Sequence, residues 1–224
     1  MRDRDEKDKR KREKDLKLQR EKQLKDAEEK KRRQQQEEEQ SRQLGGRLLT
    51  VMKKLKNDET PRDYSLAGCD LGTARTSILS KLVAHNNTLT CLHLVRKGIT
   101  DVDGLDIAKI LLTNKTLRKL ELEGNQLGPK SAKQFGLVLK VNTTLRFLDL
   151  ESNQLTMGGD DTSGVQHYLI DALRTNKSLL SLNIANNHLD ADIGKDFKAM
   201  LEQNETLIDF EIMFNQFHLE DVSC

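Results

Sequence analysis

Long apolar stretches and cysteines are both scarce in this sequence of 224 residues. No apolar run approaches the roughly 18 residues of a membrane span, and Met1 is followed by charged residues instead of the apolar stretch of a signal peptide. We therefore expect a cytoplasmic protein that makes no membrane contact. The three cysteines, Cys69, Cys91 and Cys224, are widely scattered, without C-x-x-C spacing or a matching group of histidines. Because this spacing indicates neither a disulfide framework nor a metal site, we expect reduced thiols and no metal.

The motifs of common catalytic sites are missing as well. The sequence has no glycine-rich phosphate loop, no H-E-x-x-H and no G-x-S-x-G, and its five histidines have no recurring carboxylate or thiol partner. Asp160 and Asp161 stand together in a glycine-containing loop, where two carboxylates are weak evidence for a cation site. We therefore expect a protein that is not an enzyme and that has no cofactor and no small-molecule substrate.

Charge is distributed unevenly along the chain. Residues 1–43 hold 17 of the 38 basic and 13 of the 36 acidic residues but almost no apolar side chain, so this arm cannot build a core. Acidic residues repeatedly precede basic ones by four positions, which favours a single solvated helix, with a disordered arm as the alternative. The arm lacks the apolar heptads of a coiled coil and the aromatic residues that stack on bases. We therefore expect a charged spacer or docking helix and no nucleic-acid partner.

One phrase recurs through the rest of the chain. Its first leucines are spaced by 28, 28, 34 and 28 residues and are Leu89, Leu117, Leu145, Leu179 and Leu207. With a degenerate copy near Tyr64, the phrase occurs about six times. The pattern is L-x-x-L-x-L-x-x-N-x-L, and its period of two predicts a short strand with inward leucines. The asparagine is predicted to be a buried amide that bonds to the backbone of neighbouring coils.

The pattern resembles the 28-residue leucine-rich repeat of the ribonuclease-inhibitor class over roughly residues 60–217. The resemblance implies an α/β solenoid in which each strand is followed by a helix of the outer layer. Apolar residues at i, i+3 and i+4 between the phrases, such as Ile107, Ile110 and Leu111, predict these helices. A second asparagine follows each predicted helix, where we expect a left-handed cap, at Asn86, Asn114, Asn142, Asn176 and Asn204.

The two ends of a solenoid need covers, because no repeat can bury its apolar face alone. Residues 44–60 are interpreted as a capping helix and a linker, and residues 61–224 as the leucine-rich-repeat domain. The apolar residues on one face of the capping helix are Leu44, Leu48, Val51, Met52 and Leu55. The sequence reaches Cys224 where the next outer helix should begin. We therefore expect the C-terminal cap to be missing.

The single long interval between repeats carries six extra residues within Thr156–Gly164. These are predicted to form a mobile loop on the rim of the solenoid. Insertions in solenoids often form part of a binding site. Neutral drift explains this insertion equally well.

In this repeat class, partners are often held on the concave strand face, whose outward residues follow from the register. Glu121 is then expected beside Asp149, and Glu123 beside Glu151, as like charges about 4.8 Å apart. We hypothesise that this acidic patch receives a basic segment of a protein partner. The residues at its edge are Lys119, Phe147, Arg118 and Arg146. A merely solvated face, whose repulsion salt screens to a few tenths of a kcal/mol, fits the pattern equally well.

Taken with the missing catalytic motifs, the repeats favour a binding or scaffold protein whose solenoid holds a protein segment while the arm reaches a second contact. A Lys/Glu-rich helix with few repeats looks most like cytoskeletal and ciliary leucine-rich-repeat proteins. Two other functions stay open. Some ribonuclease-inhibitor-like solenoids activate the GTPase Ran, which would require a rim arginine such as Arg96, Arg118 or Arg146. The second is an actin-capping module that resembles the tropomodulin repeat domain.

Overall fold

The chain divides into two units, residues 1–46 and residues 47–224. The computed structural model describes Lys22, Lys25, residues 28–32, Gln35, and residues 46–67, 69, 71–157 and 161–216. In the first unit the described residues are helical and exposed, and the rest of the predicted arm, 1–43, lies outside the described residues. None of the described helices is both long and apolar enough to cross a membrane.

A parallel sheet forms one layer of the second unit. Within the described residues, six strands pair in their order along the chain, each with the next. They are β1 (Asp63–Ser65), β2 (Cys91–His93), β3 (Lys119–Glu121), β4 (Phe147–Asp149), β5 (Ser181–Asn183) and β6 (Asp209–Glu211). The register pairs equivalent positions of successive repeats, for example Leu92 with Leu120 and Leu120 with Leu148. This arrangement confirms the predicted α/β leucine-rich-repeat solenoid.

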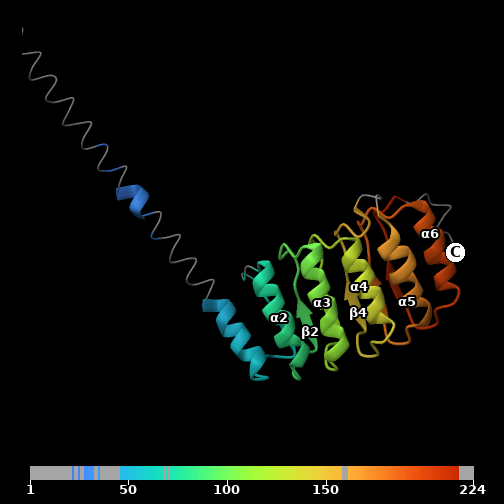
Figure 1. The fold of residues 1–224 in the computed structure, drawn as a ribbon, viewed down its shortest axis with the longest axis horizontal. Helices are drawn as coiled ribbons and strands as arrows, with labels where there is room; N and C mark the ends of the chain where they lie inside the picture. The colour runs from blue at the N-terminus through green and yellow to red at the C-terminus, as the bar shows by residue number, and fades with distance from the viewer. Residues whose placement is uncertain are drawn as a thin grey trace, which may run out of the picture. The chain divides into compact units, whose positions relative to one another are not determined.

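Helices form the second layer and stand side by side in front of the strands (Figure 1). They are α2 (Thr73–His85), α3 (Asp101–Thr113), α4 (Pro129–Leu139), the π-helix η2 (Gly164–Leu169), α5 (Ile170–Thr175) and α6 (Ala191–Leu201). Local signals explain where several of them begin. Thr100 and Asp103 form a reciprocal capping box at α3, Pro129 occupies the first turn of α4, and Asp190 accepts a hydrogen bond from the N–H of Ile193 at α6.

The core lies between these two layers. The middle residues of the interior strands point inward and are at most 2% exposed, at Leu92, Leu120, Leu148 and Leu182. One face of each helix covers them, as Phe135 and Phe197 do from α4 and α6. Because each strand is only three residues long, each coil depends on its neighbours for burial.

Buried asparagines join successive coils, as the sequence predicts. Asn153 accepts a hydrogen bond at 3.0 Å from the N–H of Leu127 and donates at 3.0 Å to the carbonyl oxygen of Leu122, both in the preceding coil. The buried Asn125 and Asn187 and the partly buried Asn215 make equivalent bonds. The amide suits this position because it offers both a donor and an acceptor to backbone groups that no water reaches.

The prediction of left-handed caps after the helices is wrong. The φ angles are −76°, −67° and −69° at Asn86, Asn114 and Asn176, which is extended backbone. The positive-φ residues that the structure describes do not include Asn142 or Asn204 either. The side chain makes a left-handed turn unnecessary. Asn114, for example, donates at 2.8 Å to the carbonyl oxygen of Val83 and accepts at 2.7 Å from the N–H of Leu117.

The first coil is covered by a helix over residues 46–56. Leu48, Val51 and Leu55 are buried in the common core, and the side-chain amide of Asn86 donates to the carbonyl oxygen of Leu55 at 3.0 Å. At the far end of the solenoid, Ile208 and Phe214 are 81% and 80% exposed. The outer helix expected after them, at 219–222, lies outside the described residues.

The inserted segment is anchored at both ends. Thr156 is buried and donates hydrogen bonds to the carbonyl oxygens of Asn187 and His188. Gly164 is also buried and begins η2, where a Cβ atom would lie 2.1 Å from the carbonyl oxygen of Pro129. Both ends of the insertion are therefore fixed to the packed coils, and the mobility of the loop between them stays a prediction. Residues 158–160 lie outside the described residues.

Candidate functional site

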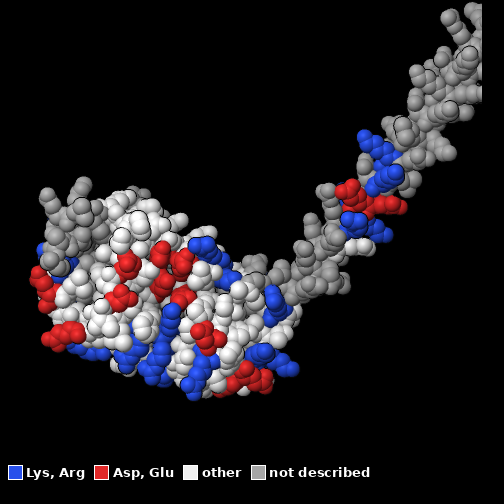
Figure 2. Space-filling model, turned by 180° about the vertical axis from the view of Figure 1, so that it is seen from behind, with Lys and Arg blue, Asp and Glu red and all other residues white. Residues whose placement is uncertain are grey.

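The first and third residues of each strand point away from the core, and together they form what we call the strand face. Figure 2 views the molecule from behind the helices and shows acidic side chains gathered on this face, with basic side chains along one edge. The third positions carry Ser65, His93, Glu121, Asp149, Asn183 and Glu211, paired in register from strand to strand. The structure therefore brings Glu121 beside Asp149, as the repeat spacing predicts.

Basic neighbours already balance the negative charge of Glu121. The Nζ atom of Lys119 lies 2.6 Å from one carboxylate oxygen, and Nδ1 of His93 bonds to the other. Burial alone would raise the pKa of Glu121, but the hydrogen bonds from Lys119 and His93 outweigh it and lower the pKa below its usual value. Glu121 is thus an ionised carboxylate that holds two basic side chains in place.

The arginines proposed for the rim are held as well. Arg96 pairs with Glu123 at 2.9 Å, and its backbone is left-handed, with a φ of 53°. Arg118 and Arg146 stand directly before β3 and β4 and donate to backbone carbonyl oxygens, those of Thr144 and Ser178, at 3.1 and 2.7 Å. To act on a partner's phosphate, an arginine would first have to break these hydrogen bonds or this ion pair. The GTPase-activating role stays a prediction.

Asp149 and Glu151 differ from the other two acids of the predicted patch. Among the residues that the structure describes, no ion pair joins either carboxylate to a basic side chain. Asp149 accepts a hydrogen bond from the backbone N–H of Glu151 at 2.9 Å, and Glu151 accepts one from the amide of Asn183 at 2.8 Å. Burial raises the pKa of Asp149 above its usual value, and the negative charges of Glu151 and Glu123 raise it further. Within the predicted acidic patch, the unbalanced negative charge therefore lies on Asp149 and Glu151.

A second cluster on the strand face joins β1 and β2. Nε2 of His93 lies 2.6 Å from the carboxylate of Asp63 and 3.2 Å from the sulfur of Cys91. Burial raises the pKa of the Cys91 thiol to about 11, with a further contribution from Asp63. Burial alone would lower the pKa of His93, but its hydrogen bonds with Glu121 and Asp63 raise it above the usual value.

Sequence reasoning missed this cluster for a definable reason. The nearby cysteine and histidine were visible, but Asp63 precedes the first regular copy of the repeat and was not placed in register with them. The degenerate copy near Tyr64 already follows this register, and the residue that precedes Tyr64 is Asp63, the pairing partner of Cys91.

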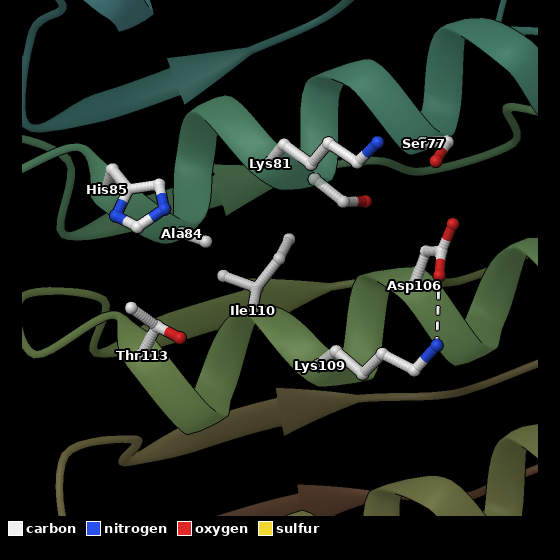
Figure 3. Close-up of a pocket in the computed structure, with 9 residues that line it drawn as sticks. Ser77, Lys81, Ala84, His85, Asp106, Lys109, Ile110 and Thr113 are labelled. Carbon is white, nitrogen blue, oxygen red and sulfur yellow. Dashed lines mark hydrogen bonds and ion pairs between the residues drawn. The ribbon is translucent and has the colours of Figure 1, made fainter.

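A hollow of about 340 Å³ lies on the helical side of the solenoid, between α2 and α3. Figure 3 shows Lys81 and His85 on α2 facing Asp106, Lys109 and Ile110 on α3. Asp106 and Lys109 form an ion pair at 3.2 Å. Burial would raise the pKa of Asp106, but a hydrogen bond from Ser77 and the charge of Lys109 lower it below the usual value. Two lysines, Lys81 and Lys109, face the single carboxylate of Asp106, so the hollow carries net positive charge and does not suit the basic segment predicted for the strand face.

The aspartate pair of the insertion is only half described. Asp160 lies outside the described residues. Asp161 accepts hydrogen bonds from the backbone N–H and the hydroxyl of Ser163, at 3.1 and 2.7 Å, so its carboxylate serves the turn before η2.

Comparisons with known proteins agree with this fold. A family model described as "Leucine Rich repeat" matches residues 113–136, 141–159 and 175–197. A solved structure titled "Leiomodin-1 Actin-Binding Site 2 (ABS2)" is similar, with a TM-score of 0.52 and 19% identity over 68% of this chain and 86% of that one. The C-terminal domain of tropomodulin from Caenorhabditis elegans is similar with a TM-score of 0.55 and 17% identity, over 70% of this chain and 92% of that one. A search of curated proteins finds no match. At these identities the likeness shows the fold.

Proposed function

We propose that this leucine-rich-repeat protein of the ribonuclease-inhibitor-like class is a non-enzymatic scaffold that holds a protein segment on its strand face. In this proposal, a lysine or arginine of the segment lies against Asp149 and Glu151. The observation that carries it is the contrast within the acidic patch. Glu121 and Glu123 have basic partners inside the chain, whereas Asp149 and Glu151 have none among the described residues.

The energetics of the strand face support a basic partner. A half-buried carboxylate without a cation costs free energy, which its raised pKa expresses. A partner's ammonium or guanidinium group would relieve that cost and gain charge-assisted hydrogen bonds. Phe147 lies on the same face of β4, two residues before Asp149, and its side chain is 43% exposed. An aromatic ring at this point can cover the aliphatic stem of a long basic side chain.

Affinity capture from a cell lysate tests this proposal. The full chain is compared with the double variant Asp149→Asn, Glu151→Gln, which removes two charges while keeping the shape and the oxygen acceptors. The matched control is Glu202→Gln, Glu205→Gln, which removes two charges from exposed positions at the end of α6 and beyond it. We expect the strand-face variant to lose proteins that the control retains, and the loss to resemble the effect of raised salt. Identical protein sets from all three would show a merely solvated face.

Actin is a second candidate partner. The similar structures include a leiomodin segment that is titled an actin-binding site, and the likeness covers most of that chain. On this basis we propose cosedimentation of the full chain with actin filaments, together with elongation assays from filament ends. Slower elongation that the Asp149 and Glu151 variant abolishes would place actin on the strand face, whereas unchanged elongation at saturating protein would exclude filament capping. If actin is the partner, the protein is located at the cytoskeleton. A ciliary location stays a prediction.

A further inference from the structure

We propose that Asp63, Cys91 and His93 form a zinc-binding site at the first coil of the solenoid. The site is separate from Asp149 and Glu151, and it reverses the expectation drawn from the spacing of the cysteines. A thiolate sulfur, an imidazole nitrogen and a carboxylate oxygen are the three kinds of ligand atom that zinc binds in proteins.

The backbone alone brings the three residues together. Asp63 and Cys91 are direct partners in the register of β1 and β2, so their side chains leave the sheet on the same face. His93 follows Cys91 by two residues in the same strand, and strand alternation returns it to that face. The convergence therefore rests on strand pairing, which the whole solenoid enforces.

The ligand atoms are close enough to share one ion. A carboxylate oxygen of Asp63, the sulfur of Cys91 and a ring nitrogen of His93 all lie within 4.8 Å of one another. Tetrahedral zinc with bonds of about 2.0–2.3 Å would separate these atoms by about 3.3–3.6 Å. The distance between Nε2 of His93 and the Asp63 carboxylate, now 2.6 Å, would therefore lengthen by less than about 1 Å. Asp63 has room for this change, because its side chain is 72% exposed. The fourth position would be taken by water.

Glu121 prepares the histidine for this role. Its carboxylate bonds to Nδ1 of His93, which leaves Nε2 as the nitrogen that faces Asp63 and Cys91. Zinc-bound histidines usually have their second nitrogen held by a carboxylate or carbonyl group in this way, which fixes the ring and its tautomer. Lys119 in turn holds the other oxygen of Glu121 at 2.6 Å. Binding would release two protons to solvent, the one that Nε2 of His93 donates to Asp63 and the thiol proton of Cys91, as the nitrogen and the sulfur become zinc ligands.

The competing interpretation is a hydrogen-bonded group in which His93 is protonated between Asp63 and Glu121 and no ion takes part. The two differ in the role of sulfur. A metal site needs the Cys91 thiolate as a ligand, whereas a histidine held between two carboxylates does not need Cys91 at all.

Metal titration of the reduced full chain tests the proposal. Zinc affinity is measured by competition with a chromophoric chelator, and cobalt is used as a spectroscopic substitute because a cobalt–thiolate bond absorbs in the near ultraviolet. The variants are Cys91→Ser, His93→Gln and Asp63→Asn, of which the last changes an exposed side chain and leaves packing intact. The matched control is Cys69→Ala, which removes another cysteine that the structure describes as free. Circular dichroism checks that each variant is folded.

We expect one zinc ion per chain, and a loss of affinity of at least about 100-fold in each of the three ligand variants. Cys91→Ser should also abolish the cobalt–thiolate absorption. Glu121→Gln should weaken binding by roughly 10–100-fold and leave that absorption in place, since it acts through His93. Cys69→Ala should bind as the natural chain does. The proposal is overturned if the natural chain binds no stoichiometric zinc, if Cys69→Ala loses as much affinity as Cys91→Ser, or if the absorption survives in Cys91→Ser.

Discussion

Replacing Asn153 with alanine should destabilise the solenoid by an amount that its hydrogen bonds allow us to work out. Its side-chain NH₂ group donates to the carbonyl oxygens of Leu122, Leu150 and Glu151, each at 3.0 Å, and its oxygen accepts from the N–H of Leu127. The residue is 3% exposed, so water does not replace these bonds readily.

The substitution would not affect the hydrogen bonding of these four backbone groups equally. The three carbonyl oxygens keep second partners, the amides of Asn125 and Asn187 and the N–H of Gly124. Only the N–H of Leu127 would lose its acceptor, and an unsatisfied buried donor costs about 1–3 kcal/mol. The weakened bonds to the carbonyl oxygens add on the order of 1 kcal/mol, so we expect a total loss of about 2–4 kcal/mol.

Thermal and urea unfolding, followed by circular dichroism, measure this loss. At about 2–4 °C per kcal/mol for a domain of this size, Asn153→Ala should lower Tm by roughly 4–16 °C. The matched control is Gln154→Ala, which removes an amide side chain from the adjacent, exposed position and should change the free energy of unfolding by less than about 0.5 kcal/mol. If the two variants unfold alike, the amides do not join the coils as argued here, and the coils are held together by leucine packing alone.

Three further substitutions, one of them with a control, test other parts of the structure. Gly136→Ala should cost about 1–3 kcal/mol, because the new Cβ atom would lie 2.4 Å from the backbone of Tyr168, whereas Gly46→Ala, in a helix with open space, should not destabilise. Thr100→Ala should cost about 1 kcal/mol in urea unfolding through loss of the capping box. Asp149→Asn should stabilise the protein at pH 7. Since the folded state raises the pKa of Asp149, its ionised form opposes folding above that pKa, and the advantage of the variant should shrink as pH falls through it. An advantage that is constant with pH would contradict this assignment.

Much of this protein follows from its repeat. The 28-residue spacing predicts the order and pairing of the strands, the inward leucines, the amides that join the coils and the columns of the strand face. It also places Glu121 beside Asp149, because parallel strands of identical repeats bring equivalent positions together. The binding role of these acids stays a prediction.

Only the tertiary structure decided which acids are balanced and which side chains meet. Lys119 and His93 reach Glu121, and Arg96 reaches Glu123, but no basic side chain among the described residues pairs with Asp149. Strand alternation determines the face on which a side chain lies. A long lysine or arginine side chain on that face can still form an ion pair with any of several carboxylates within reach. Which ion pair forms depends on burial and on the surrounding charges, and the repeat pattern of the sequence contains neither. The repeat spacing places Asp63 beside Cys91, but only the side-chain conformations in the structure join its carboxylate to His93.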